Sequence, residues 1–341
     1  MEKKLKYIFC ILSFAVFSFG QVFSATGDGS LSDSNLKYIG RWDKSCKTVY
    51  HSYWGGAYFK TLFSGTTVQL KLDAAVNLYV NIDGAGFKKF EARDSLLNLT
   101  PTGLEPGVHT LVVAAAYAND EIQFKGLKLD PGAETFSPPV NDLIEFIGNS
   151  ITSGQNTTKG NLSAYAWLTG ESLDLEHTQI SQPGITLTDG YHYEGDWAPK
   201  RGQISQYFLT KQPNHQKNNL WNFDTYTPKI IVINLGTNDY NLNVPGTIFS
   251  ENYRNFLKQI RTKFPKTEIF VMRTFGGYYA SETARVVDQF RRNDLRIHYI
   301  DTSNWLSHPE DFVDTNHPND QGHIKVALKL SEILNSFLEL H

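Results

Sequence analysis

Apolar residues recur at two different spacings along the chain, and the change between them divides the sequence into two parts. Between Tyr38 and Asp130, apolar and polar residues alternate with a period of two, which is typical of strands with one buried face. Asp83-Gly84 follows one such run directly, and Asp-Gly between strand-like runs predicts a hairpin. Because no convincing helix interrupts these short runs, we predict an antiparallel, jelly-roll-like β-sandwich. The strand-like runs are Val68–Leu72, Leu78–Ile82, His109–Ala115 and Glu121–Leu129.

After Val140 the apolar residues form short continuous runs, as expected for the strands of a parallel sheet that is covered on both faces. Segments with helical spacing lie between these runs. Strands that alternate with helices predict a doubly wound α/β domain. The expected strands are Leu143–Ile147, Lys229–Leu235, Glu268–Met272 and Ile297–Ile300, and the expected helices are Ala164–Leu173, Phe249–Phe264, Glu282–Arg292 and Asp320–Leu340.

The segment from Pro131 to Pro139 fits neither pattern. It is rich in proline and poor in structure, and such stretches are where domain boundaries lie. We therefore place the β-sandwich domain at residues 26–135 and the α/β domain at residues 136–341.

The first 25 residues have the composition of a secretory signal peptide. Three lysines among the first seven residues precede the 13-residue apolar run Ile8–Gly20, and small residues follow that run. A membrane anchor is the alternative, but 13 apolar residues are too few to span about 30 Å of hydrocarbon comfortably. No later run approaches the length of a membrane span. We expect cleavage near Ser24-Ala25 and a secreted or periplasmic protein without a membrane partner.

Charge and cysteine content narrow the classes of function. The 341 residues include 32 Lys and Arg against 35 Asp and Glu, a net charge of −3, so the basic excess typical of nucleic-acid-binding proteins is missing. Of the two cysteines, Cys10 lies in the expected signal peptide, which leaves Cys46 without an intramolecular partner. We expect Cys46 to be a buried side chain rather than a reactive thiol. Aromatic residues make up 13% of the chain and suit both β-rich cores and stacking surfaces.

Ser150 follows the expected strand Leu143–Ile147 almost directly, and Gly148 permits a tight turn between them. Ligands of α/β sheets bind at the carboxyl ends of the strands. A serine that leads into a helix N-terminus also has backbone N–H groups nearby that can stabilise an anion. The alternative is that Ser150 only caps the next helix, which is the usual role of a serine at such a position.

Two further segments place polar groups at the same edge of the expected sheet. Asn238 closely follows the apolar run Lys229–Leu235, so it belongs beside Ser150. Gly184 precedes a loop, and the N–H of a glycine can approach a ligand closely. Both residues favour a functional role for Ser150.

Asp314 and His317 supply a carboxylate and an imidazole near the C-terminus. Their spacing of three residues lets both side chains face one way in a turn. Pro318 disfavours helical structure at the residue before it, which supports such a turn.

Taken together, these four segments resemble the GDSL/SGNH hydrolase superfamily, the flavodoxin-like serine esterases. The family's Gly-Asp-Ser block is Gly148-Asn149-Ser150 here, its glycine block matches Gly184, its Gly-x-Asn-Asp block matches Gly236–Asp239, and its Asp-x-x-His-Pro block matches Asp314–Pro318. Each block alone is a weak signal, but four in the family's order and strand context are specific. The resemblance covers the second part of the chain and implies a three-layer α/β/α hydrolase domain.

A β-sandwich placed before such a hydrolase, with Gly40-Arg41-Trp42 near its start, is similar to carbohydrate esterase family 2. Members of that family remove acetyl groups from xylan and related plant polysaccharides. The resemblance therefore implies an acetyl xylan esterase-like enzyme whose partner is an acetylated polysaccharide or oligosaccharide. Asn149 departs from the family's usual Asp, but it keeps the shape and a hydrogen-bond acceptor, so we expect activity to persist.

The resemblance and the chemistry of serine give one mechanism, which needs no cofactor. His317 accepts the proton of Ser150 as the serine oxygen attacks the ester carbonyl, and Asp314 orients the imidazole. The backbone N–H groups of Ser150 and Gly184 and the side-chain amide of Asn238 form the oxyanion hole. We expect no metal, because ligand-like spacing to cysteines or carboxylates is missing for three further histidines, His51, His192 and His298.

Several aromatic side chains could stack on sugar rings, although packing within an irregular loop is the alternative. Two other residues near the blocks have structural interpretations: Asp239 is expected to support its own loop, and His323 to be a surface or capping residue of the last helix. The aromatic candidates are Tyr191, Trp197, Trp221 and Tyr278, together with their neighbours Tyr193 and Tyr279.

Two other functions stay open at this point. A lipase or thioesterase could use the same catalytic frame, but lipid chains would require an extended apolar groove, whereas the loops here are polar and aromatic. A carbohydrate-binding protein whose hydrolase has decayed is the second alternative. The presence of Ser150, Asn238, Asp314 and His317 argues against it. We expect the protein to be a monomer.

Overall fold

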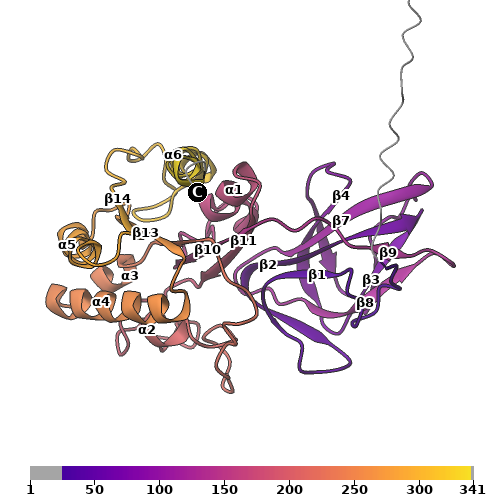
Figure 1. Ribbon diagram of the computed structural model, residues 1–341, viewed down its shortest axis with the longest axis horizontal. Coiled ribbons are helices and arrows are strands. Elements are labelled where there is room, and N and C mark those ends of the chain that lie inside the picture. Colours follow the sequence, from indigo (N-terminus) through magenta and orange to yellow (C-terminus); the bar gives the residue numbers. More distant parts are fainter. Residues whose placement is uncertain (1–24, 339–341) are drawn as a thin grey trace, which may run out of the picture.

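The computed structural model describes residues 25–338, which form two domains arranged along the long axis of the molecule (Figure 1). The all-β domain occupies one end and the α/β domain the other. Apart from Ala25, the expected signal peptide lies outside the described residues. None of the helices between residues 25 and 338 combines the length and the apolar character that a membrane crossing requires.

The N-terminal domain is a nine-stranded antiparallel sheet that is nearly closed. The main strand order is β5-β4-β7-β2-β8-β3-β6, and β1 and β9 pair with β2. The sheet encloses an apolar core in which Phe59, Phe63 and Phe124 are fully buried. The predicted antiparallel β fold is confirmed. The strands are β1 (Lys37–Asp43), β2 (Tyr50–Gly65), β3 (Val68–Leu72), β4 (Val76–Ile82), β5 (Lys88–Ala92), β6 (Leu96–Asn98), β7 (Gly107–Ala115), β8 (Gln123–Leu129) and β9 (Thr135–Phe136).

Strand β2 organises the N-terminal domain because it pairs with four other strands, β1, β7, β8 and β9. Trp54 and Gly56 have positive φ angles of 68° and 73°, which interrupt its extended conformation. Cys46 lies in the loop before β2 and is exposed. The prediction that Cys46 is buried is therefore wrong, because this loop does not pack against the core.

The C-terminal domain contains five parallel strands in the order β11-β10-β12-β13-β14. With the strands numbered as they occur in this domain, the order is 2-1-3-4-5, that of flavodoxin-like sheets. The four predicted strands are confirmed, each within two residues at either end. The strands are β10 (Leu143–Gly148), β11 (Glu176–Ser181), β12 (Ile230–Ile233), β13 (Glu268–Met272) and β14 (Ile297–Ile300).

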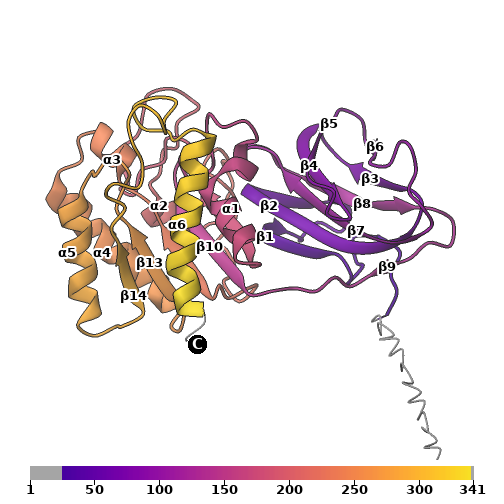
Figure 2. The ribbon, with the colours of Figure 1, turned by 90° about the horizontal axis from the view of Figure 1, so that it is seen from above.

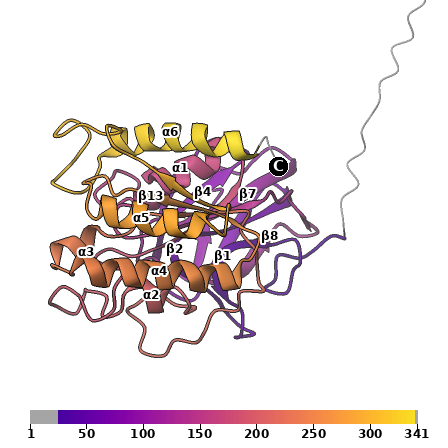
Figure 3. The same ribbon diagram turned by 60° about the vertical axis from the view of Figure 1, so that its left-hand side comes forward.

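Helices cover both faces of the parallel sheet, which gives the predicted three-layer arrangement (Figures 2 and 3). α1 and α6 pack together on one face, and α4 and α5 pack together on the other. In α4 the apolar stripe that predicted a helix, including Tyr253, Phe256 and Leu257, is buried in the core beneath the sheet. The helices are η1 (Gly160–Ser163), α1 (Tyr165–Ser172), α2 (Gln203–Gln206), α3 (Thr237–Asn241), α4 (Gly246–Lys263), α5 (Ala280–Arg291) and α6 (Asp320–Leu338).

The edge strand β11 lies against the N-terminal domain. Its sequence, EHTQIS, is mostly polar, yet every residue in it is buried. Glu176 of this strand accepts the Tyr58 hydroxyl proton at 2.6 Å and forms an ion pair with Lys60. Because its polar side chains are buried against a second domain, β11 lacks the apolar run that marks the other strands, and the sequence pattern did not predict it.

Arg41, from the Gly40-Arg41-Trp42 segment, is fully buried where the two domains meet. Its Nη1 donates to the carbonyl oxygens of Tyr207 at 2.5 Å and Leu209 at 2.6 Å. The guanidinium carbon lies 5.8 Å from the ring centre of Trp54 and 5.5 Å from that of Trp221. Arg41 therefore joins the N-terminal domain to the Tyr207–Trp221 part of the hydrolase domain.

The order of the strands in the parallel sheet changes direction at β10: β11, the next strand in the sequence, lies on one side of β10, and β12 lies on the other. Loops that leave neighbouring strands at such a switch point diverge, and the crevice between them is where ligands bind in open α/β sheets. Ser150, Gly184 and Asn238 follow β10, β11 and β12 respectively. All three residues consequently belong to the same edge of the sheet.

Candidate active site

Ser150 lies two residues beyond β10, in a tight turn, and its exposed fraction is 6%. The turn requires glycine at position 148, because a Cβ there would lie 2.0 Å from Thr152 Oγ1. Asn149 Oδ1 accepts the N–H of Ile151 at 3.0 Å, which is a bond that an Asp could make as well. Asn149 thus maintains the turn without introducing a charge beside Ser150.

The chain after Ser150 forms consecutive turns, so the helix N-terminus considered for this serine is not found directly after it, whereas the helix expected over Ala164–Leu173 is observed as α1. The N–H of Ser153 donates to Asn149 O at 3.1 Å and that of Gln155 to Ser150 O at 3.0 Å, but Gly154 has a φ of 70° and ends the run. The next helical segment begins at Gly160. Ser150 therefore does not cap a helix, which removes the main structural alternative for this residue.

His317 approaches Ser150 from the turn that precedes α6. Its Nε2 lies 2.9 Å from Ser150 Oγ, and its Nδ1 lies 2.8 Å from Asp314 Oδ2. The turn is closed by the N–H of Val313, which donates to His317 O at 2.9 Å. The structure thus brings together the three residues that the sequence singles out, in the carboxylate–imidazole–hydroxyl order that activates a serine.

The carboxylate of Asp314 is held by three short hydrogen bonds and one longer one. Oδ1 accepts the backbone N–H groups of Asn316 and His317, both at 2.8 Å, and the imidazole is the third donor. Partial burial tends to raise the pKa of Asp314, but these donors outweigh it and hold the pKa below its ordinary value. Asn156 Nδ2 adds a longer contact to Oδ2 at 3.3 Å. Asp314 is therefore negatively charged throughout the neutral pH range.

Three N–H donors lie at the sheet edge where Ser150 is placed. Within residues 25–338, the backbone N–H groups of Ser150 and Gly184 take part in no hydrogen bond. Gly184 has a φ of 77°, a conformation that favours glycine. Asn238 is buried, and its Nδ2 donates one hydrogen to Ile185 O at 2.7 Å, which leaves the second hydrogen available. Unused N–H groups beside a nucleophile are what an oxyanion hole requires.

Contrary to the expectation that Asp239 supports its own loop, its side chain holds the loop that follows Gly184. Its two carboxylate oxygens accept the N–H groups of Leu187 at 2.8 Å and Thr188 at 3.0 Å. Burial raises the pKa of Asp239 to about 6, although the two N–H donors oppose this effect. Asp239 therefore ties the loop after β11 to α3, and these two segments carry the expected oxyanion donors Gly184 and Asn238.

Two of the four candidate aromatic residues lie beside these groups. Trp197 is 57% exposed, and its ring covers Gly184 so closely that a Cβ at that glycine would lie 2.8 Å from the ring. Tyr278 donates its hydroxyl proton to Asn316 Oδ1 at 3.2 Å and stacks on Tyr240, with ring centres 4.2 Å apart. Trp197 and Tyr278 are therefore placed where a substrate could contact them.

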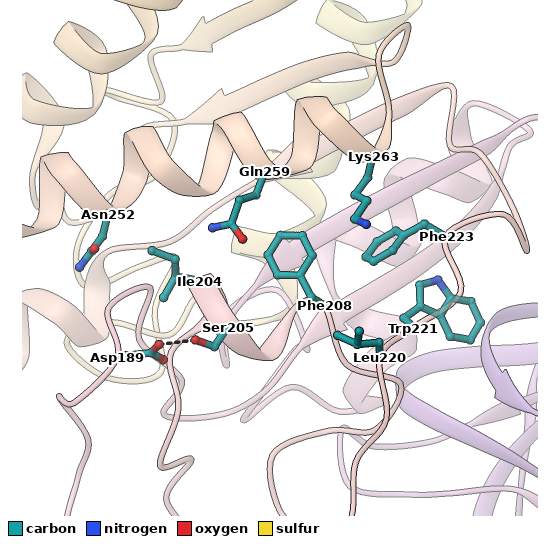
Figure 4. Close-up of a pocket in the computed structure, with 10 residues that line it drawn as sticks. All are labelled: Asp189, Ile204, Ser205, Phe208, Leu220, Trp221, Phe223, Asn252, Gln259 and Lys263. Atoms are coloured by element: carbon teal, nitrogen blue, oxygen red, sulfur yellow. Dashed lines mark hydrogen bonds between the residues drawn. The ribbon is translucent and has the colours of Figure 1, made fainter.

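The structure places the other two candidates elsewhere. Tyr191 is half-buried against the apolar core on the α4 side of the sheet. Trp221 lines a groove of about 680 Å³ and lies at its end near Lys263 (Figure 4). Since Lys263 ends α4, just before the amino end of β13, this part of the groove lies toward the sheet edge opposite Ser150. The structure does not bring Trp221 to the serine.

His323 is fully buried, so the prediction of a surface or capping residue is wrong. Its Nδ1 accepts the N–H of Tyr165 at 3.0 Å, and its ring stacks on that tyrosine because α6 packs its first turn against α1. Burial lowers the pKa of His323 to about 4, so the ring is neutral at pH 7. In the part of the chain that the structure describes, no group of three or more His, Cys, Asp or Glu side chains could hold a metal ion.

Two further contacts of the site could not be predicted from the sequence. The hydroxyl of Tyr193 donates to Asn238 Oδ1 at 3.1 Å, and Asn241 Nδ2 donates to that hydroxyl at 3.2 Å. Asn156 reaches Asp314 from the turn after Ser150. The sequence placed Tyr193 in the aromatic loop, but only the folded structure shows which side chains that loop contacts.

Family comparisons agree with the architecture. The model described as "GDSL-like Lipase/Acylhydrolase family" matches residues 146–324, and the model described as "Carbohydrate esterase 2 N-terminal" matches residues 38–139. Among characterised relatives, Cellulase/esterase CelE of Acetivibrio thermocellus is 27% identical over 293 residues, covering 78% of this chain and 35% of CelE. The present chain thus aligns with about a third of that relative. Acetylxylan esterase / glucomannan deacetylase of Cellvibrio japonicus is 23% identical over 72% of this chain and 76% of its own.

Solved structures show the same fold. A family two carbohydrate esterase from Clostridium thermocellum, in complex with cellohexaose, superposes with a TM-score of 0.78 at 25% identity, covering 89% of this chain and 99% of that one. The acetyl xylan esterase Est2A from Butyrivibrio proteoclasticus gives a TM-score of 0.78 at 18% identity, covering 93% and 99%. Both domains are included in these superpositions, so their arrangement is shared as well.

Proposed function

Because the chain belongs to the GDSL-like lipase/acylhydrolase family and carries a carbohydrate esterase 2 N-terminal domain, we propose that it is a serine esterase that removes O-acetyl groups from plant cell-wall polysaccharide. The observation that carries this proposal is the continuous contact from Asp314 through His317 to the Ser150 hydroxyl. Three N–H donors at the same sheet edge support it. The polysaccharide is xylan or glucomannan, the substrates in the name of the Cellvibrio relative.

The reaction has two halves. In the first, Ser150 Oγ attacks the acetyl carbonyl carbon while His317 Nε2 takes the hydroxyl proton, and the carbonyl oxygen becomes an oxyanion. The N–H groups of Ser150, Gly184 and Asn238 stabilise that oxyanion. As the carbon–oxygen bond to the sugar breaks, His317 returns its proton to the sugar oxygen, which leaves acetyl-Ser150. In the second half, His317 deprotonates a water molecule, whose oxygen attacks the acetyl carbonyl carbon; as the bond from that carbon to Ser150 Oγ breaks, His317 returns the proton to Oγ and acetate is released.

Acetyl transfer to water fits the surroundings of the serine better than lipid hydrolysis. Two exposed side chains beside the site, Trp197 and Tyr240, are aromatic with polar tips. Flat aromatic rings suit the apolar faces of sugars. A lipase or thioesterase is the alternative, and relative rates on acetate and octanoate esters distinguish the two. A decayed, purely binding protein would not react with a fluorophosphonate at Ser150.

The test is acetate release from acetylated xylan, acetylated glucomannan and simple acetylated sugars. Wild-type protein should release acetate, and Ser150→Ala should release none above background because the nucleophile is gone. Ser172→Ala, at an exposed position at the end of α1, is the matched control and should retain full activity. Undiminished activity of the Ser150→Ala variant would refute the proposed mechanism.

We also propose that the protein is exported after cleavage near Ser24-Ala25. The basic start and the short apolar run of the first 25 residues support this. N-terminal sequencing of protein recovered outside the cytoplasm tests it. A chain that stays inside the cell and begins at Met1 would contradict export.

A further inference from the structure

Asn238 can serve as an oxyanion donor in only one of its two amide orientations. The amide nitrogen carries hydrogens, whereas the amide oxygen is an acceptor of similar size. With Nδ2 toward the reacting carbonyl, the side chain stabilises the oxyanion; with Oδ1 there, it repels the oxyanion. Something in the structure must therefore favour the first orientation.

We propose that Tyr193 is a positioning residue that fixes the amide orientation of Asn238; the inference rests on the proposed function. The Tyr193 hydroxyl donates to Asn238 Oδ1 at 3.1 Å. Asn241, three residues further along α3, donates its Nδ2 to the same hydroxyl oxygen at 3.2 Å. Because a hydroxyl has one proton, and Asn241 occupies its oxygen as a donor, the proton of Tyr193 is directed to Asn238 Oδ1.

The opposite side of the amide agrees with this orientation. Asn238 Nδ2 donates to Ile185 O at 2.7 Å, one residue beyond Gly184. A reversed amide would place Oδ1 against the carbonyl oxygen of Ile185 and Nδ2 against the Tyr193 hydroxyl. Two acceptors would then face each other at Ile185, two donors would face each other at Tyr193, and both hydrogen bonds would be lost. Asn238 is 6% exposed, so water compensates little for such a loss. Ile185 and Tyr193 together leave one N–H of Asn238 free for the substrate.

The loop between Asp189 and Gly202 brings Tyr193 to this position. Asp189 closes the loop by accepting the N–H of Gly202 at 2.8 Å. The ring of Tyr193 stacks on Trp197, with ring centres 5.7 Å apart and planes 26° apart, and Trp197 in turn covers Gly184. One loop therefore contacts two of the oxyanion donors: a ring covers Gly184 and a hydroxyl orients Asn238.

The test is a double-mutant cycle of Tyr193→Phe and Asn238→Ala. Tyr193→Phe keeps the ring stacked on Trp197 and removes only the hydroxyl. We expect Tyr193→Phe to lower kcat on 4-nitrophenyl acetate about 10-fold and to change KM less than about 2-fold, because it weakens one oxyanion donor without removing it. Asn238→Ala removes that donor and should lower kcat about 10²–10³-fold. The double variant should be no slower than Asn238→Ala alone, because Tyr193 acts through Asn238.

Two controls exclude a general effect on folding. The melting temperatures of all variants should equal that of the wild type, and Tyr117→Phe on the N-terminal domain, the matched control, should keep wild-type activity. The inference is overturned if Tyr193→Phe keeps wild-type kcat, or if the two losses multiply in the double variant.

The rate of Ser150 labelling by a fluorophosphonate provides a second measurement, because that reaction also places charge in the oxyanion hole. If wild-type protein is labelled but releases no acetate, the proposed substrate is wrong, and the labelling rate of Tyr193→Phe still decides the inference. If wild-type Ser150 is not labelled, both proposals fail.

Discussion

Both oxygens of Asp314 lie near His317 Nδ1, Oδ1 at 3.0 Å and Oδ2 at 2.8 Å, but only Oδ1 also accepts backbone N–H groups, and this difference predicts that Asp314→Asn is more damaging than Asp314→Ala. Oδ1 accepts two backbone N–H groups, from Asn316 and His317, whereas Oδ2 contacts the imidazole at its shorter distance, 2.8 Å. In an asparagine, the oxygen must take the Oδ1 place, because an amide NH₂ cannot accept from the backbone. The NH₂ group then faces His317 Nδ1.

This reversed contact selects the unproductive form of His317. An NH₂ group donates to Nδ1, which must then be unprotonated, so the proton of the neutral ring moves to Nε2. A histidine with its proton on Nε2 cannot accept the proton of Ser150. Asp314→Ala, in contrast, removes the carboxylate but leaves His317 free to keep its proton on Nδ1. Substitution of a buried triad aspartate by asparagine lowers kcat by about 10⁴-fold through this effect.

The loss in Asp314→Ala can be bounded from the geometry. Opposite charges about 4 Å apart interact by about 1 kcal/mol in bulk water and about 4 kcal/mol near a protein surface. The Asp314 side chain is 44% exposed, so the interaction with the imidazolium of the transition state lies between these limits. At 1.4 kcal/mol for each factor of ten, the expected loss in kcat is between about 5-fold and 10³-fold.

The assay is kcat on 4-nitrophenyl acetate between pH 5 and 9, with Asp73→Asn on the N-terminal domain as the control. Because the folded-state pKa of Asp314 lies below its ordinary value, its contribution to stability is present above pH 4 and is lost only as the pH falls through that lower value. Titration of Asp314 therefore does not shape the profile in this range. Equal losses in the two variants, or a greater loss in Asp314→Ala, would refute the argument from the two oxygens.

Two other substitutions test the domain contact and the substrate surface. Arg41→Met should lower the free energy of unfolding by about 1–4 kcal/mol, because it leaves the buried carbonyl oxygen of Tyr207 and the partly buried one of Leu209 without a donor. An unchanged urea midpoint would contradict this. Trp197→Ala should raise KM for acetylated xylo-oligosaccharides roughly 10-fold by removing a stacking surface. Kinetics on the oligosaccharide and on 4-nitrophenyl acetate measure it, and an effect of the same size on both esters would argue against sugar stacking.

The parts of the fold that depend on local pattern could be predicted from the sequence. Strands β10, β12 and β13 are mostly apolar because helices cover both sides of the sheet, and α4 shows the apolar stripe that it buries. Strand β11 could not be predicted, since its polar residues are buried by tertiary contacts, some with α1 and others with a second domain. Contacts of this kind join residues that lie more than 100 positions apart, as Tyr58 and Glu176 do.

In the site, too, the residues in local motifs could be predicted, whereas those that depend on tertiary contacts could not. Ser150, Asp314 and His317 could be singled out because their motifs follow a strand or form a turn, and the structure brings them together. The consecutive turns after Ser150 could not be predicted, because the pattern does not show that Gly154 takes a positive φ. Trp221 and Trp197 lie in the same polar stretch of sequence, yet only Trp197 covers Gly184, since Arg41 holds Trp221 at the domain contact.

The N-terminal domain takes part in shaping the site even though it supplies none of the three residues in contact at Ser150. Gly184 follows β11, and β11 is the edge strand that the N-terminal domain covers. Gln182, two residues before Gly184, donates its side-chain amide to Asn119 of the N-terminal domain at 2.8 Å. An edge strand with polar side chains would be costly to leave without such partners, because unpaired buried polar groups destabilise a fold. The position of the Gly184 N–H therefore depends on both domains, which gives a physical reason for the hydrolase domain to be joined to this particular β domain.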